Sequence, residues 1–142
     1  MYEYKCEVTR VVDGDTVDCV LDLGFSILHK CRVRLYGIDT PESRTRDLDE
    51  KARGKLAAKF LQDSIDSGKD IVLRSELKDS KGKYGRVLGS IVVDDLDINK
   101  AMIANNLAVK YFGQSKSDVE AEHMINKDIL IAEGAYEPIS DI

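Results

Sequence analysis

Apolar and polar residues alternate along part of the N-terminal third of the chain, which is the pattern of strands with one buried face. Cys31, Val33 and Leu35 fall on one face of such a segment. Arg32 and Arg34 fall on the opposite face. The alternation therefore predicts a strand with two arginines on its outer side, and it does not by itself distinguish one arginine from the other.

Two apolar-rich segments, residues 8–12 and 16–20, lie on either side of the dipeptide Asp13-Gly14. Asp-Gly between two strands is a strong signal for a tight hairpin, because glycine accepts positive φ. Gly24 marks a second turn before the arginine-bearing strand. We therefore expect three consecutive strands in this part of the chain.

Helical spacing of apolar residues begins after these strands. Between Ala52 and Ile65, apolar residues recur every three or four positions, which predicts an amphipathic helix. We expect this helix to begin near Asp47 or Asp49, because aspartate is a good N-cap, and to end at Gly68.

The second half of the chain predicts two strands and two further helices. Residues 71–74 and 86–93 have the composition of strands. Asp97 is placed to cap a short helix, and the segment Ser117–Glu120 has the pattern of a capping box for a last helix. We expect that last helix to extend to about Glu133.

The resulting order is three strands, a helix, two strands and two helices. This is the order of an OB-type barrel, so the sequence predicts an α+β fold, a five-stranded OB-fold β-barrel with three α-helices. The chain has 142 residues, which suits one domain, and it shows neither repeats nor an interdomain linker. We therefore expect residues 1–142 to form a single domain.

Composition and charge narrow the classes of function. Hydrophobic residues make up 43% of the chain and charged residues 33%, as in globular rather than disordered proteins. The net charge of −5 argues against a protein that simply coats nucleic acid, because such binders usually carry a basic face. Five basic residues nevertheless gather between Lys30 and Arg46, against two acidic ones. A local field of this kind can still attract a polyanion to one face.

Cysteine spacing and hydropathy exclude further classes. The three cysteines, Cys6, Cys19 and Cys31, show no CxxC or Cys/His spacing, which argues against zinc and favours free thiols in the core. No apolar run is long enough to span a membrane, and no heptad pattern is present, so a monomer is expected. The N-terminus lacks the layout of a secretory signal. The protein therefore either stays inside the cell or has lost a leader.

Three short segments, VDGDTV at 12–17, RLYGIDTPE at 34–42 and KYGR at 83–86, combine acidic and arginine side chains. Hard divalent cations prefer the oxygen ligands that carboxylates supply. Guanidinium groups can bind a phosphate in a bidentate manner. A metal, a carboxylate that activates water and two arginines would together stabilise the charge that develops during attack on a phosphodiester.

Each segment alone also has a simpler interpretation. Asp13-Gly14-Asp15 is compatible with a hairpin turn and nothing more. Asp39 and Glu42 could flank a solvated turn. Arg34 could be an ordinary surface residue, and Lys83-Tyr84-Gly85-Arg86 could be a solvated charged loop.

Taken together, the segments closely resemble those of the staphylococcal nuclease (thermonuclease) family. The resemblance covers nearly the whole chain, from about Tyr4 to Glu133. Its signatures are the Asp-Gly-Asp-Thr-Val hairpin, an arginine five residues before Asp-Thr-Pro-Glu, and a downstream Lys-Tyr-Gly-Arg. The spacing to Asp39, which is taken from the family, selects Arg34 over Arg32.

The resemblance implies a role for each matched position. Asp15 and Asp39 would bind Ca²⁺ through their carboxylates, and Thr40 would bind it through its backbone carbonyl. Arg34 and Arg86 would clamp the scissile phosphate.

Four further positions receive roles in the same way. Glu42 would act as the general base, or would position the attacking water. Lys83 and Tyr84 would contact a neighbouring phosphate. Tyr111 or Phe112 would stack on a base, and ordinary core packing is the alternative for either aromatic residue.

The reaction that the resemblance implies is the hydrolysis of DNA and RNA, with single strands preferred and 3′-phosphate ends produced. The same barrel can also serve as a catalytically silent module that binds nucleic acid or protein. A calcium-binding structural domain is a third alternative. All six implied metal and catalytic positions are present, which favours the enzyme. Two arginines beside the carboxylates would have no purpose in a structural calcium site.

Two histidines remain without a role in this reading. His29 lies in the region before Arg34, and His123 lies in the last predicted helix. Neither has a partner at the spacing of a metal site or a catalytic triad. We therefore expect solvent exposure or a structural role for both.

Overall fold

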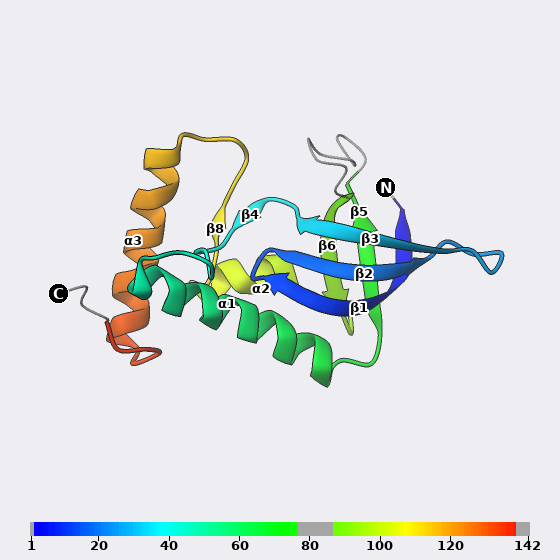
Figure 1. Cartoon of the computed structure of the whole chain (residues 1–142), viewed down its shortest axis with the longest axis horizontal. Coiled ribbons are helices and arrows are strands. Elements are labelled where there is room, and N and C mark those ends of the chain that lie inside the picture. Colours follow the sequence, from blue (N-terminus) through cyan, green and yellow to red (C-terminus); the bar gives the residue numbers. More distant parts are fainter. Residues whose placement is uncertain (1, 77–86, 139–142) are drawn as a thin grey trace.

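The computed structural model describes residues 2–76 and 87–138, and Figure 1 shows their arrangement. A β-barrel forms one part of the molecule, with α1 (Leu48–Ser67) along one side of it. Helix α3 (Lys116–Ala132) stands beside one end of the barrel. The fold is α+β, as predicted. None of the helices in this part of the chain has the length and apolar character that crossing a bilayer requires.

Five strands form the barrel: β1 (Glu3–Asp13), β2 (Thr16–Asp22), β3 (Leu28–Leu35), β5 (Ile71–Ser75) and β6 (Val87–Val93). They are hydrogen-bonded in the order β3-β2-β1-β5-β6, and a parallel pairing between β3 and β6 closes the barrel. The short strand β7 (Leu96–Asp97) pairs with β6. The predicted five-stranded barrel with three helices is confirmed.

The hydrophobic core fills the barrel and continues to α1 and α2 (Ile98–Ala104). Its most completely buried side chains come from the strands and these two helices: Val17, Val33, Leu35, Leu73, Ile91, Leu61, Ile98 and Met102. Val33 and Leu35 therefore occupy the buried face of β3, as the alternation predicted. The opposite face of the same strand is left to present its arginines.

The three cysteines are free, as predicted. Cys6 and Cys19 are buried, whereas Cys31 is half-buried at the margin of the core. Cys19 and Cys31 are direct partners on β2 and β3, with their Sγ atoms 3.8 Å apart. Burial, together with the neighbouring Cys19 thiol, raises the pKa of Cys31 to about 12. The Cys31 thiol is therefore protonated at neutral pH.

The hairpin between β1 and β2 forms where the Asp-Gly dipeptide predicted it, but the reason given for the glycine was wrong. The φ of Gly14 does not lie in the left-handed region. A Cβ at Gly14 would instead approach within 2.7 Å of Ala57 Cβ on α1 and 3.0 Å of Thr40 Oγ1. Glycine is needed here because the hairpin turn packs directly against α1.

The first two helices begin where their caps predicted. The side chain of Asp47 accepts hydrogen bonds from the backbone N–H groups of Asp49 and Glu50 at 3.0 and 3.1 Å. Asp97 caps α2 in the same manner. Aspartate at these positions satisfies N–H groups that have no partner within the helix.

The cap of α3 was predicted two residues too late. Ser115, not Ser117, is the N-cap, and its hydroxyl accepts from the backbone N–H of Asp118 at 3.3 Å. Ser115 has an extended backbone, whereas Ser117 already lies within the helix. A serine inside the first turn cannot occupy the capping position, so the Ser117–Glu120 pattern did not mark the helix start.

A second, two-stranded ladder lies between the barrel and α3. Strand β4 (Ile38–Asp39) pairs antiparallel with β8 (Val109–Lys110). The backbone N–H of Tyr111 also donates to the carbonyl of Gly37 at 2.9 Å. This ladder was not predicted, because two-residue strands leave no periodic pattern in the sequence. Strand β4 leads from β3 toward α1, and β8 leads from α2 toward α3.

Helix α1 also supports the loop that follows β4. A Cβ at Gly54 would come within 2.6 Å of the carbonyl carbon and oxygen of Glu42 and 2.7 Å of the Ser43 nitrogen. The side chain of Glu50, one turn earlier on α1, accepts from the backbone N–H of Glu42 at 3.1 Å. Direct contact with α1 therefore fixes the position of the Glu42–Ser43 backbone.

Gly54→Ala provides a test of this contact. In an ordinary helix interior the change stabilises a protein by about 1 kcal/mol. Here the new methyl group would push the Glu42–Ser43 backbone away, so we expect a loss of about 1–3 kcal/mol in the free energy of unfolding, measured by urea titration. Lys55→Ala, at the adjacent exposed position, is the control and should change stability little. A more stable Gly54→Ala protein would contradict the close approach.

Candidate functional site

Asp15 is the second residue of the hairpin turn, directly before β2, and is 9% exposed. Its Oδ1 accepts a hydrogen bond from the Thr16 hydroxyl at 3.1 Å, and its Oδ2 accepts one from the Thr40 backbone N–H at 3.2 Å. Its own carbonyl accepts from the Leu35 N–H at 2.8 Å. The carboxylate is therefore held by Thr16 and Thr40, and the backbone of Asp15 is held by Leu35.

Arg34 places its guanidinium group between two carboxylates. It lies on β3 opposite Thr16 in the strand register, beside Asp15. Its NH2 nitrogen is 3.4 Å from Asp15 Oδ2 and 3.6 Å from Asp39 Oδ1, while NH1 donates to the Leu35 carbonyl at 2.8 Å. One positive charge is thus shared by two acidic side chains in a largely buried place.

Arg32, two residues earlier on the same strand face, is in a different environment. Its side chain is 49% exposed, against 16% for Arg34, and it pairs with Asp18 at 2.7 Å. The hydrogen bond from Arg32 lowers the pKa of Asp18 below its usual value. Because the outer face of β3 runs from solvent into the molecule, the structure separates two arginines that the alternation could not.

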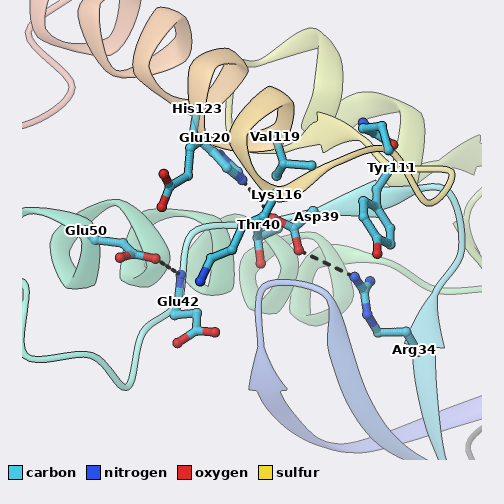
Figure 2. A pocket seen from close by; sticks show the side chains of 11 residues that line it. Arg34, Asp39, Thr40, Glu42, Glu50, Tyr111, Lys116, Val119, Glu120 and His123 are labelled. Atoms are coloured by element: carbon cyan, nitrogen blue, oxygen red, sulfur yellow. Dashed lines mark hydrogen bonds and ion pairs between the residues drawn. The ribbon is translucent and has the colours of Figure 1, made fainter. Parts of the chain in front are cut away.

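Asp39, on β4, divides its two oxygens between different partners (Figure 2). Oδ1 faces Arg34, and Oδ2 lies 2.8 Å from His123 Nε2. An ionised carboxylate can only accept, so Nε2 carries the proton and donates. This contact joins β4 to α3.

His123 was missed as a member of the site. The sequence analysis expected solvent exposure or a structural role, and the residue is in fact buried beside Asp39. A signal was present in the helix, since His123 lies four residues after Val119 and seven before Leu130. Those three side chains form the buried face of α3. A histidine on the inner face of a helix must find a polar partner.

A pocket of about 510 Å³ opens above this group of side chains (Figure 2). The predicted residues that line it are Arg34, Asp39, Thr40, Glu42 and Tyr111. No site role was predicted for the other lining residues: Glu50, Gln114, Lys116, Val119, Glu120 and His123. The pocket therefore combines residues from the barrel, β4, α1 and the start of α3.

Glu42 and Tyr111 border different parts of the pocket. Glu42 is exposed and lies on the far side of Asp39 from Arg34 in Figure 2, with its backbone held by Glu50. Tyr111 lies on the side of Arg34. Phe112 does not line this pocket; its ring packs edge-on against Tyr36 with centroids 6.0 Å apart. Of the two aromatic candidates, only Tyr111 therefore lines the same pocket as the acidic residues.

Lys83, Tyr84 and Arg86, the predicted substrate-binding residues and second arginine, lie outside the residues that the structure describes. Their assigned roles stay predictions.

Two acidic residues of the site, Asp39 on the pocket wall and Asp15 beside Arg34, suit a hard divalent cation. Asp15 and Asp39 each place a carboxylate oxygen near the same guanidinium nitrogen of Arg34. Thr40 follows Asp39 in the sequence, and its backbone N–H donates to the Asp15 carboxylate. Oxygen donors of this type fit calcium or magnesium better than softer metals. Within the described ranges, no three His, Cys, Asp or Glu side chains surround a common point. A metal here would need backbone and solvent oxygens as additional ligands.

Comparison with known proteins places this site in a wider context. The sequence profile of the family described as "Staphylococcal nuclease homologue" matches residues 32–131. Endonuclease YhcR of Bacillus subtilis (strain 168) is 34% identical over 118 residues, which cover 78% of this chain and 9% of that protein. Thermonuclease of Staphylococcus intermedius is 32% identical over 102 residues, which cover 71% of this chain and 52% of that protein.

Protein ParB of Escherichia coli is also similar, at 32% identity over 120 residues, 77% of this chain and 58% of that protein. The chain thus spans less than two thirds of the length of each of these three relatives. The similarity concerns one part of these longer proteins.

The charge balance at Arg34 predicts a difference between the two arginines of β3. Arg34→Met keeps much of the aliphatic stem but leaves Asp15 and Asp39 facing each other without a cation. We expect the free energy of unfolding at pH 7 to fall by about 1–3 kcal/mol, measured by urea titration in the presence of a chelator. Arg32→Met removes an exposed ion pair and should cost less than about 1 kcal/mol. Equal losses for the two variants would contradict the bridging role of Arg34.

Proposed function

The chain belongs to the staphylococcal nuclease family, and from that premise we propose that it is a metal-dependent endonuclease that hydrolyses the phosphodiester bonds of DNA and RNA. The observation that carries this proposal is the convergence of Asp15 and Asp39 on the Arg34 guanidinium at the edge of an open pocket. Carboxylates that can hold a cation, placed beside a fixed arginine, suit a substrate that carries a phosphate.

We propose calcium as the metal, with Asp15, Asp39 and the Thr40 carbonyl as protein ligands. Calcium accepts six to eight oxygen ligands in flexible geometry, so a site with few protein ligands can be completed by water and substrate. When bound, the ion would stabilise the negative charge of the phosphate in the transition state. The burial of Asp15, and its hydrogen bonds to Thr16 and Thr40, would hold this part of the ligand set ready.

Arg34 acts as the phosphate clamp in this proposal. Its NH1 group is anchored to the Leu35 carbonyl, which fixes the plane of the guanidinium. The NH2 nitrogen faces the two carboxylates at 3.4 and 3.6 Å, distances longer than those of good hydrogen bonds. A phosphate oxygen can therefore become a better partner for these N–H groups. Arg86 is the second clamp residue in the resemblance.

Glu42 is proposed to activate the attacking water. Its side chain is exposed on the pocket wall, and its backbone position is set by α1 through Glu50 and the close contact at Gly54. Among the described residues, no hydrogen bond or ion pair occupies the Glu42 carboxylate, so it could accept the proton of a water molecule held near the phosphate. Glu42 and Arg34 both line the pocket and lie on opposite sides of Asp39 (Figure 2), so a phosphate bound to Arg34 would lie on the far side of Asp39 from Glu42.

Tyr111 is proposed as the base platform, next to Arg34 on the pocket wall. A base can stack on an aromatic ring only when it is not already stacked in a duplex. This geometry supports the preference for single strands that the family resemblance implies. The 3′-phosphate ends are proposed on the resemblance alone.

The central test is cleavage of heat-denatured DNA and of RNA with calcium, with magnesium, and with a chelator. We expect cleavage with millimolar calcium and none with chelator, with ends that a 3′-phosphatase can dephosphorylate. Absence of cleavage under all three conditions by a folded protein would favour a silent binding module instead.

Glu42→Gln tests the base. We expect kcat to fall by about 10²–10⁴-fold, because the amide cannot accept the proton from water, while the calcium affinity changes little. Glu122→Gln, on the exposed face of α3 and outside this pocket, is the matched charge-removing control. Wild-type turnover of Glu42→Gln would remove Glu42 from the mechanism.

A further inference from the structure

We propose that His123 is a positioning residue that orients the Asp39 carboxylate and thereby sets the affinity of the site for its divalent cation. The inference rests on the proposed function, because it assigns Asp39 as a metal ligand. It adds a residue on α3 to a site otherwise built from the barrel, β4 and the loop after it.

The geometry of Asp39 is the first argument (Figure 2). His123 Nε2 binds Oδ2 at 2.8 Å, while Oδ1 faces Arg34 at 3.6 Å. Of the two contacts, only that to His123 has the length of a good hydrogen bond. It therefore fixes which oxygen of Asp39 faces Asp15 and Arg34, and it leaves that oxygen available for a metal.

Asp39 needs such support because its own strand fixes only the backbone. β4 has two residues, and the register with β8 places Asp39 opposite Val109. Backbone pairing does not restrict rotation of the carboxylate about its side-chain bonds. Without the contact to His123, the carboxylate could turn toward solvent. Metal binding would then have to restrict its rotation, at a cost in conformational entropy.

His123 itself is held firmly by the packing of α3. Val119 and Leu130 are buried on the same face of the helix. Asn126 donates from Nδ2 to the Ala108 carbonyl at 3.2 Å, and Lys127 Nζ lies 3.1 Å from Asp49 Oδ2 on α1. The helix is thus tied both to the segment before β8 and to α1. Its histidine presents Nε2 from a fixed position.

A purely architectural role is the competing explanation, in which His123 only fastens α3 to β4. That role and the positioning role differ in what they predict. If the role is architectural, any replacement of His123 lowers the stability of the metal-free protein, and the metal affinity of each variant falls in proportion to its loss of stability. Positioning predicts that metal affinity follows the presence of a donor at the location of Nε2, because such partners orient ligand atoms directly.

His123→Gln and His123→Asn form a matched pair for the experiment. Both carry an amide donor, but only glutamine reaches the location of Nε2; asparagine is one methylene shorter. The calcium dissociation constant is measured by calorimetry on each folded variant. Thermal unfolding is measured in chelator, and kcat is measured at saturating calcium. His29→Asn, at an exposed position on β3, is the control for loss of a histidine.

We expect His123→Asn to raise the calcium dissociation constant by about 10-fold or more, and His123→Gln to raise it by less than about 3-fold. We expect kcat at saturating calcium to stay near the wild-type value in both, because a bound ion holds Asp39 in place. A wild-type dissociation constant in His123→Asn would overturn the inference, and so would equal losses of affinity in the two variants.

The wild-type protein separates this inference from the proposed function. If the wild type neither binds calcium nor cleaves, the proposed function fails and the inference fails with it. If the wild type binds calcium and cleaves, and His123→Asn binds calcium as tightly, only the role of His123 is wrong.

Discussion

The site depends on one electrostatic constraint, namely that two carboxylates, the buried Asp15 and the partly exposed Asp39, are brought together around one guanidinium group. Asp15 and Asp39 would repel each other without compensation, and Arg34 supplies it with a single nitrogen between their oxygens. The compensation is built into the barrel, because the register of β2 and β3 sets Arg34 opposite Thr16, the neighbour of Asp15. In such an arrangement the two carboxylates can bind a cation and the arginine can bind a phosphate, in place of part of their contacts with each other.

Close packing on α1 is the second constraint on the site. The helix passes beneath the hairpin turn at Gly14 and beneath the loop at Glu42, and in both places the approach leaves no room for a Cβ. Gly14 and Gly54 thus determine how near two functional segments lie to one rigid helix. The helix is also capped at Asp47 and buried along one face. Neither segment can therefore shift toward or away from α1 without disturbing close packing.

The third helix turns a barrel margin into a pocket. Its N-terminal half supplies one wall, and its buried face supplies His123 to Asp39. The family match includes this helix as well as Arg34 and the acidic segment after it. The wall therefore lies within the residues that match the family, while the histidine contact is a feature found in this structure.

The sequence by itself determined the barrel strands, the helices and most of the residues that meet at the site. Strand alternation, caps at Asp47 and Asp97, and the three motif segments predicted the barrel, two of the helix starts and the acidic residues of the pocket. These signals are local, since each depends on residues within a few positions of one another. Strand alternation could not decide which arginine meets the carboxylates, and the family spacing selected Arg34. The tertiary structure supplies the physical reason, because Arg32 and Arg34 differ in depth rather than in strand face. It also decided that His123 belongs to the site, because that contact joins residues 84 positions apart, and packing between a helix and a strand leaves no short-range pattern in the sequence.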